Sequence, residues 1–331
     1  LLATLLGLNQ GCTQAPEEPS LIVLIAVDQL RGDLLDQYDE AFSGGFRRLL
    51  DDGYRYTNAS HPFAVTHTAA GHASISTGVP PSRSGIVANT WSQRTGEDWR
   101  QTYCVADDES PILGFENTQG VSGRSPKNLL RGGLADWIRE ADGNALTVSI
   151  SAKDRSAITL AGKTDSHVYW LLHEEGRFVT SQYYAQAYPD WVQRFNEEVM
   201  PVLLADTIWE SGVPVGIQPL ARPDFATYER RGNSTFPHVS SVEEEVHNEW
   251  AFDSPKSDEA VLALATIAME ELALGQQGSA DFLALGLSST DYIGHLFGPL
   301  SQEQLSNLIH LDRVLGEFFD YLDTSVGEGE W

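Results

Sequence analysis

Basic residues are scarce in this chain of 331 residues. It has 21 Lys and Arg against 47 Asp and Glu, which gives a formal net charge of −26. This charge argues against nucleic acid or an anionic membrane surface as the main partner, because both are themselves negatively charged. A small anionic substrate is still compatible with it, since a few local cations or metal ions can reverse the field inside one pocket.

Cysteine is rarer still, and the sequence has no initiating Met. The N-terminal apolar run is too short to span a bilayer and leads to Cys12 and a Pro- and Glu-rich tether, as in a secretory signal with a bacterial lipoprotein site. We therefore expect residues 1–19 to be a signal-peptide remnant with a lipidated Cys12, and the protein to be exported to the periplasm or cell surface. A chance cysteine in a cleaved leader is the alternative. Lipidation of Cys12 would leave Cys104 alone and exclude a disulfide scaffold.

The 41% of hydrophobic residues is enough for a sizeable core, and apolar runs alternate with stretches of helical periodicity. The predicted strands are Leu21–Val27, Tyr54–Thr57, Leu146–Ile150 and Phe282–Leu287. The predicted helices are 42–51, Thr68–Ser76, Leu134–Ala141, Ser257–Leu274 with Ser257 and Gly275 as caps, and Asn307–Leu322. This alternation predicts an α/β fold with a doubly wound, mainly parallel sheet and helices on both faces. Residues from about 160 to 250 break the rhythm and are expected to form an inserted cap region over the sheet.

Polar side chains follow three of the predicted strands. Asp28 follows Leu21–Val27, and Lys153 and Arg155 follow Leu146–Ile150. Asp291 and His295 follow Phe282–Leu287. Because ligands of open α/β sheets collect beyond the carboxyl ends of the strands, we expect these groups to form one site. Each has a simpler alternative: a helix cap for Asp28, a surface pair flanking Asp154 for the two cations, and a solvated helix face for the Asp-x-x-x-His pair. The spacing of that pair also places both side chains on one helix face, where they can share a metal.

The stretch THTAAGHASISTG, residues 66–78, contains several hydroxyls and no acidic residue. A hydroxyl at a helix N-terminus faces unpaired backbone N–H groups and the positive end of the helix dipole. That position suits a nucleophile that attacks a phosphorus or sulfur ester, provided that a metal stabilises the alkoxide. An ordinary Thr N-cap is the alternative.

Together these residues resemble one family. The sequence is similar, from about residue 20 to 331, to the type I phosphodiesterase/nucleotide pyrophosphatase branch of the alkaline phosphatase superfamily, and within it to the periplasmic alkaline phosphatases with a Thr nucleophile. The resemblance is carried by Thr68 and His72, Thr77-Gly78, the Pro-x-x-x-Gly-Ile loop at 81–86, Asp28, and the Asp291 and His295 pair in its Ser-Ser-Thr-Asp-Tyr context.

The resemblance implies zinc-dependent hydrolysis of phosphate monoesters through a phospho-threonine intermediate. By analogy the nucleophile is Thr68 rather than Thr66. The implied ligands of two Zn²⁺ ions are Asp28, Thr68, Asp291 and His295, and the implied phosphate-binding residues are Asn89, Lys153 and Arg155. Extra cations favour a monoester, because its dianion has more unshielded oxygen charge than a diester. His72 is expected to brace the nucleophile turn, and no role is assigned to His61 and His67.

Some residues that the family needs are missing from the sequence. A two-zinc site of this kind needs an adjacent Asp-His pair and a later His, and the sequence contains no Asp-His pair. We therefore expect residues 20–331 to be the N-terminal part of a C-terminally truncated catalytic domain. The alternatives in function are a phosphodiesterase or nucleotide pyrophosphatase of the same branch, and a non-catalytic binding homologue.

Overall fold

A computed structural model describes residues 19–116, 118–164, 166–229, 234–240 and 244–331. Residues 1–18 of the predicted leader remnant, Cys12 among them, lie outside these residues, so lipidation stays a prediction. Cys104 is a buried free thiol. None of the helices within the described residues combines the length and apolar character that crossing a membrane requires.

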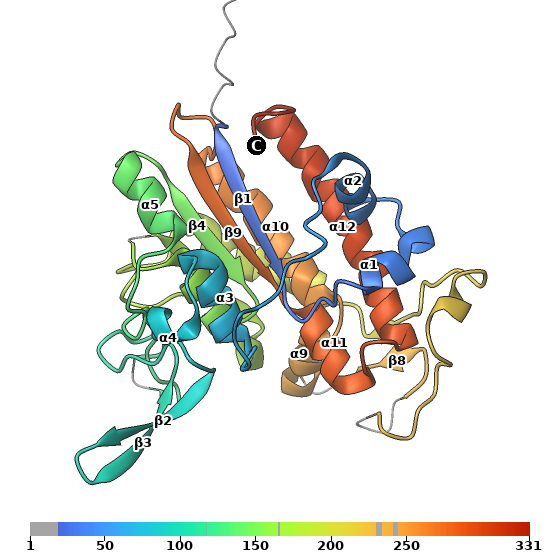
Figure 1. Ribbon diagram of the computed structural model, residues 1–331, viewed down its shortest axis with the longest axis horizontal. Helices are drawn as coiled ribbons and strands as arrows, with labels where there is room; N and C mark the ends of the chain where they lie inside the picture. The colour runs from blue at the N-terminus through green and yellow to red at the C-terminus, as the bar shows by residue number, and fades with distance from the viewer. Residues whose placement is uncertain (1–18, 117, 165, 230–233, 241–243) are drawn as a thin grey trace, which may run out of the picture.

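A five-stranded sheet with the order β1-β9-β4-β5-β6 forms the centre of the molecule (Figure 1). Its strands are β1 (Leu21–Val27), β9 (Asp281–Leu287), β4 (Thr147–Ser151), β5 (His167–Leu172) and β6 (Arg177–Val179). The first four run parallel, and β6 pairs antiparallel with β5. The predicted α/β sheet is therefore confirmed, with Leu21–Val27 at the predicted bounds.

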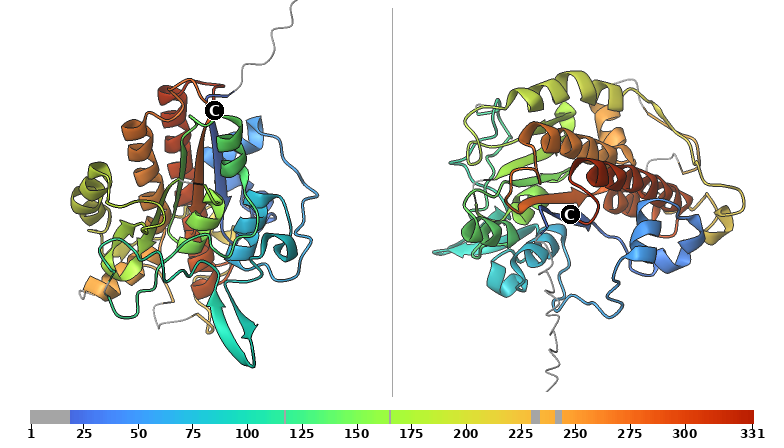
Figure 2. Two further views of the ribbon diagram at one scale, coloured as in Figure 1. Left: turned by 90° about the vertical axis from the view of Figure 1, so that its left-hand side faces the viewer. Right: turned by 90° about the horizontal axis from the view of Figure 1, so that it is seen from above.

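The sheet is covered by helices on both faces, as Figure 2 shows in its left view. Side chains alternate between the faces of β1: Val23 and Ile25 join one apolar core, while Leu24 and Ala26 join another. The first core contains α2 (Gly45–Asp52), α10 (Lys256–Leu272) and α12 (Gln302–Ser325). The opposite face packs against α3 (Thr68–Thr77), α5 (Leu134–Ala141) and α6 (Asp154–Ala161).

Smaller elements complete the described chain. The remaining α-helices are α1 (Leu34–Gln37), α4 (Pro81–Ser84), α7 (Asp190–Arg194), α8 (Met200–Leu203), α9 (Glu244–Phe252) and α11 (Ser289–Phe297). Two antiparallel pairs lie outside the main sheet: β2 (Thr90–Thr95) with β3 (Asp98–Tyr103), and β7 (Ile208–Trp209) with β8 (His238–Val239). The β2–β3 hairpin projects from the body of the molecule (Figure 1).

Register brings the predicted strand-end groups to one edge of the sheet. Val27 of β1 is level with Leu287 of β9, and Gly286 of β9 is level with Ser151 of β4. The three strands are parallel, so the residues that follow them emerge side by side. This alignment places Asp28, Lys153 and α11 around one point.

Three local predictions are corrected. The segment Tyr54–Thr57 forms no strand, and both of its tyrosines are exposed. Helix α10 is capped by Pro255 and by Ala273, not by Ser257 and Gly275. Its chain already turns at Ala273, whose φ of 48° ends the helix before the glycine is reached.

The predicted insertion over about 160–250 also begins with sheet structure. Residues 168–171 are buried on both faces of β5, because this apolar run continues the main sheet beside β4. The irregular part of the segment starts after β6. Its apolar side chains, including Trp191 and Phe195, pack into the same core as α10.

Candidate active site

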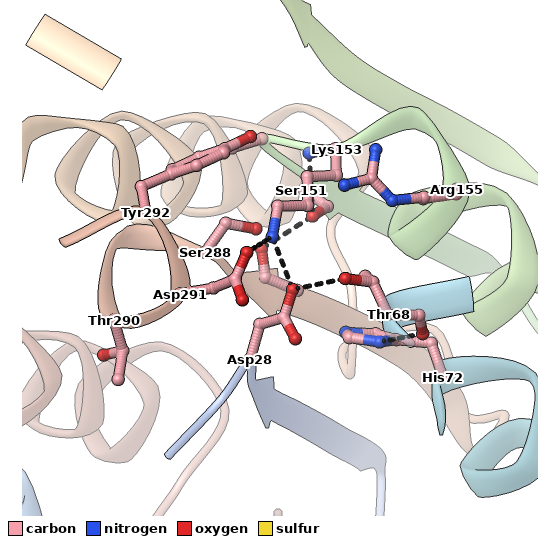
Figure 3. A network of polar contacts seen from close by, with 12 residues as sticks. Asp28, Thr68, His72, Ser151, Lys153, Arg155, Ser288, Thr290, Asp291 and Tyr292 are labelled. Carbon is pink, nitrogen blue, oxygen red and sulfur yellow. Dashed lines mark hydrogen bonds and ion pairs between the residues drawn. The ribbon is translucent and has the colours of Figure 1, made fainter. Parts of the chain in front are cut away.

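Asp28 is the centre of the polar cluster at the carboxyl end of the sheet (Figure 3). The chain turns sharply after it, because Gln29 adopts a left-handed conformation with φ of 59°. Helix α1 begins only at Leu34, so the Asp28 side chain does not cap a helix that follows directly. It accepts hydrogen bonds from the Thr68 hydroxyl at 3.0 Å and from Lys153 Nζ at 2.6 Å instead.

Lys153 is buried, with 2% of its surface exposed, which rules out a surface pair flanking Asp154. Its ammonium lies between two carboxylates, since it contacts Oδ2 of Asp28 and Oδ2 of Asp291. The face of Tyr292 lies 4.5 Å from the ammonium as well. In this structure Lys153 is therefore the counter-charge of two of the predicted metal ligands, Asp28 and Asp291.

This arrangement keeps Asp28 ionised. Burial disfavours the Asp28 carboxylate, but the Lys153 ammonium and the hydrogen bonds to it outweigh that cost, and the pKa of Asp28 lies below its ordinary value. The group is thus an anion at neutral pH, ready to pair with a cation. A carboxylate with a low pKa orients a proton rather than removing it.

Thr68 is the first residue of α3, and His67 is its N-cap. The Thr68 side chain is therefore not an ordinary N-cap: its Oγ1 donates to Asp28 rather than accepting from the α3 backbone. The residue is nearly buried, with 9% of its surface exposed. Its hydroxyl oxygen sits at the positive end of the helix dipole and beside a carboxylate, as the nucleophile prediction requires.

His72 braces the first turn of α3, as predicted. Its Nδ1 donates to the Thr68 carbonyl oxygen at 2.8 Å. Burial lowers the pKa of His72, so the ring is neutral at pH 7. Its Nε2 is buried and has no hydrogen-bond partner among the residues that the structure describes.

Asn89 lies at the same helix end. Its Oδ1 accepts a hydrogen bond of 2.9 Å from the backbone N–H of Ala69, and so satisfies one of the unpaired donors of α3. With the oxygen committed, the donors that remain on the Asn89 side chain belong to its amide nitrogen. An amide NH₂ beside a helix N-terminus suits an anionic oxygen.

Asp291 and His295 share one face of α11, as their spacing predicts. His295 Nε2 lies 3.3 Å from Asp291 Oδ1, and the imidazole is 69% exposed. Sequence reasoning missed the buried residue that holds this helix: Asp258 Oδ1 accepts from the backbone N–H groups of Ser288 and Ser289. Burial raises the pKa of Asp258 to about 6. In the sequence, the only indication of this role is an acidic residue within a mainly apolar predicted helix, distant along the chain from the serines that it contacts.

The donors fit part of a zinc shell. Zinc takes carboxylate oxygens and imidazole nitrogens. Asp28 supplies such an atom next to the Thr68 hydroxyl, and Asp291 and His295 supply others on α11. In the described part of the chain, however, no three or more His, Cys, Asp and Glu side chains are close enough to hold one ion. The described residues therefore form no complete metal site by themselves.

Arg155 lies beside Lys153 and faces the same space (Figure 3). Its side chain is 22% exposed and approaches the Tyr103 hydroxyl and the Asp154 carboxylate. Direct contacts join Thr68, Asp28, Lys153 and Asp291 in one cluster. Asn89 lies beside Thr68 at the start of α3, and the exposed His295 contacts Asp291 alone among these residues. His61 lies in the loop before α3. His67, the N-cap of α3, accepts a hydrogen bond of 3.5 Å from the Asn89 backbone N–H at its Nδ1.

Known proteins are similar to this chain in sequence and in fold. Alkaline phosphatase PhoV of Synechococcus elongatus is 36% identical over 325 residues, and alkaline phosphatase PafA of Elizabethkingia meningoseptica is 33% identical over 326 residues. A crystal structure of PafA matches with a TM-score of 0.86 at 32% identity over 96% of this chain. A second PafA structure, with a TM-score of 0.88, is of a variant with Thr to Ser, Asn to Ala, Lys to Ala and Arg to Ala substitutions.

The chain spans only part of these relatives. The matches cover 96% of this chain but 58% of PhoV, 59% of PafA and 62% of the PafA crystal chain. A family model described as type I phosphodiesterase/nucleotide pyrophosphatase matches residues 22–329. With nearly the whole chain inside that match, the protein belongs to the type I phosphodiesterase/nucleotide pyrophosphatase family.

Proposed function

We propose that the whole protein is a zinc-dependent phosphomonoesterase that uses Thr68 as its nucleophile. One observation carries the proposal: the Thr68 hydroxyl at the start of α3 donates to Asp28, whose carboxylate shares one cation with Asp291. A hydroxyl, two carboxylates and a helix N-terminus at one point suit attack on an anionic ester. The names of PhoV and PafA, both alkaline phosphatases, support the same class of reaction.

The proposed reaction has two displacements. The Thr68 oxygen forms a bond to phosphorus as the bond to the leaving alcohol breaks, and water then cleaves the phospho-threonine. Zinc, held in part by Asp28, Thr68, Asp291 and His295, would lower the pKa of the attacking hydroxyl or water and stabilise the leaving oxygen. The chain itself orients the hydroxyl through Asp28, and the α3 dipole favours the incoming negative charge.

The phosphoryl oxygens are assigned to Asn89, Lys153 and Arg155. A monoester dianion exposes more charged oxygen than a diester, so a clamp of two cations and an amide favours the monoester. In this role the Lys153 ammonium turns from its two carboxylates to the substrate. The four residue types substituted in the PafA variant are the types proposed here for Thr68 and the clamp, which supports the assignment.

A diesterase of the same family is the second candidate, because the matching family model is named for that activity. The test compares a monoester and a diester chromogenic substrate with the whole protein, before and after zinc is removed by a chelator. We expect monoester turnover to dominate and to return when zinc is added. Faster diester turnover would favour the second candidate, and turnover that survives chelation would contradict zinc dependence.

We also propose that the protein is exported and anchored by lipid at Cys12. The support is the apolar run before Cys12 and the tether after it. Expression of the full precursor with labelled palmitate should label the protein, and Cys12→Ser should remove the label and release the protein from membranes. Equal labelling of both proteins would contradict the anchor.

A further inference from the structure

Arg155 is surrounded by a polar network that the reaction above does not use. Its Nη1 lies 3.4 Å from the Tyr103 hydroxyl and 3.8 Å from Asp154 Oδ1. The Tyr103 hydroxyl donates its proton to Asp154 Oδ1 at 2.6 Å. A phenol has one proton to give, so the side of the oxygen that faces Arg155 presents a lone pair. Tyr103 therefore accepts a hydrogen bond from the Arg155 guanidinium and links this guanidinium to the Asp154 carboxylate.

The charge of Asp154 is already balanced by another cation. Arg124 Nε donates to Asp154 Oδ2 at 2.5 Å, and the Arg124 guanidinium lies 5.1 Å from the centre of the Tyr103 ring. The other oxygen of Asp154 accepts from the backbone N–H of Arg155 as well as from Tyr103. One carboxylate thus serves two guanidinium groups, and this leaves the charge of Arg155 available to an anion.

The Arg155 side chain has donor capacity to spare. Its Nε is buried and has no hydrogen-bond partner among the described residues. The side chain lines a cavity of about 530 Å³ together with Lys153, Arg124 and Asp154. Burial disfavours the charge of Arg155, but Tyr103 and Asp154 outweigh it and keep the pKa of the guanidinium above its ordinary value.

The same network is tied to Asn89. Tyr103 is the last residue of β3 and pairs with Thr90, the residue after Asn89. The backbone N–H of Cys104 donates to the Asn89 carbonyl oxygen at 2.9 Å, which closes the base of the β2–β3 hairpin. Two of the residues proposed to bind phosphate, Asn89 and Arg155, are thus both connected to the base of the β2–β3 hairpin.

We propose that Tyr103 and Asp154 are positioning residues that hold the Arg155 guanidinium toward the phosphoryl group. This inference rests on the proposed function, because it assumes that Arg155 binds a phosphate oxygen. The Tyr103 hydroxyl is the acceptor that orients Arg155. Asp154 holds this hydroxyl in place, and Arg124 neutralises the charge of Asp154. Neither residue touches the substrate.

The test is a double-mutant cycle in the whole protein. Tyr103→Phe keeps the ring and removes only the hydroxyl, and it is made alone and together with Arg155→Ala. The readouts are inorganic phosphate affinity by calorimetry and kcat/KM for a monoester and a diester. Tyr183→Phe is the matched control, because the exposed Tyr183 hydroxyl donates to the Lys163 carbonyl oxygen outside this network.

We expect Tyr103→Phe to lower phosphate affinity and monoester kcat/KM by about threefold to tenfold, the range of one ordinary hydrogen bond, because the lost contact positions Arg155 rather than binding the phosphate. Diester turnover should change by less than about twofold, and the loss should vanish when Arg155 is already Ala. Tyr183→Phe should match the wild type. If Tyr103→Phe does not fold, Asp154→Asn takes its place in the same cycle with Arg155→Ala, and the same pattern of losses is expected.

Other results would overturn the inference. Equal losses on both esters, or a loss that persists beside Arg155→Ala, would give Tyr103 a structural role only. An unchanged Tyr103→Phe would leave Arg155 positioned by other groups. A wild-type protein that neither binds phosphate nor hydrolyses either ester would instead refute the proposed function, and the inference with it.

Discussion

At the scale of single residues, the site is organised by charge balance. Asp28 and Asp291 are held near each other because the Lys153 ammonium lies between them. Two carboxylates without a shared cation would repel each other and take up protons. Thr68 joins this group through one hydrogen bond, so its hydroxyl direction depends on Asp28 remaining ionised.

The nucleophile assignment predicts opposite outcomes for two threonines. Thr68→Ala should abolish formation of the phospho-enzyme, because it removes the only hydroxyl assigned to attack phosphorus. Thr66→Ala should leave most of the activity, since Thr66 precedes α3 and its N-cap. Rapid quench with a radiolabelled monoester measures the labelled protein. Loss of label in Thr66→Ala but not in Thr68→Ala would show that the wrong hydroxyl was chosen.

The phosphate clamp predicts a change in substrate preference. Combining Lys153→Ala with Arg155→Ala should lower monoester kcat/KM at least ~10²-fold, since each lost charged hydrogen bond is worth about 1.5–3 kcal/mol. Diester turnover should fall much less, because one of the oxygens concerned is esterified. Steady-state kinetics on both substrates measures the ratio. An equal loss on both would assign the pair to structure rather than to the substrate.

At the scale of elements, α12 holds α2 in place through one buried carboxylate. Asp312 accepts hydrogen bonds from the backbone N–H groups of Ser43, Gly44, Phe46 and Arg47. These are donors at the start of α2 that the helix itself cannot satisfy. Gly44 and Gly45 allow the approach, because a Cβ at either would lie 2.4 Å from an atom of α12.

Removing this carboxylate should therefore loosen the packing of α2 on α12. We expect Asp312→Ala to lower the free energy of unfolding by about 3–5 kcal/mol, as buried donors lose a charged partner. Asp312→Asn, which keeps one acceptor oxygen, should cost less. Denaturant unfolding measures both, with exposed Asp320→Ala on the same helix as a control expected to stay within about 0.5 kcal/mol. A loss as small as that of the control would contradict the capping role.

At the scale of the whole molecule, acid stability is linked to a partly buried histidine, His310. Burial, followed by the charges of Arg313 and Lys256, lowers the pKa of His310 to about 4, and these outweigh the opposing charge of Glu317. The unfolded chain therefore binds a proton at this ring at a higher pH than the folded protein does. The stability that this group contributes is complete above its ordinary pKa of ~6.5 and is lost as pH falls toward 4.

His310→Gln should accordingly flatten the decline of stability between pH 6.5 and about 4, by up to about 1.4 kcal/mol per pH unit. The measurement is the free energy of unfolding from denaturant titrations at several pH values in that window. Above pH 7 the two proteins should differ by a constant amount. Parallel curves through the acid window would mean that His310 titrates normally in the folded protein.

The chain itself determined the strands, helices and site residues that depend on local pattern. The run Leu21–Val27 is a strand because its alternate apolar side chains serve two cores, and Leu134–Ala141 is a helix at its predicted bounds. Asp28, Lys153 and Asp291 could be grouped in advance because the carboxyl ends of parallel strands meet at one edge. Tyr54–Thr57 failed because a strand needs a partner, and alternation does not supply one.

Only the tertiary structure decided which partner each polar group has. Nothing near Lys153 in the sequence indicates that its ammonium lies between Asp28 and Asp291, because Asp28 follows β1 and Asp291 lies on α11. The link from Tyr103 to Asp154 likewise joins a hairpin base to a helix start. Local periodicity determines which face a side chain takes, whereas hydrogen-bond partners depend on how distant elements pack.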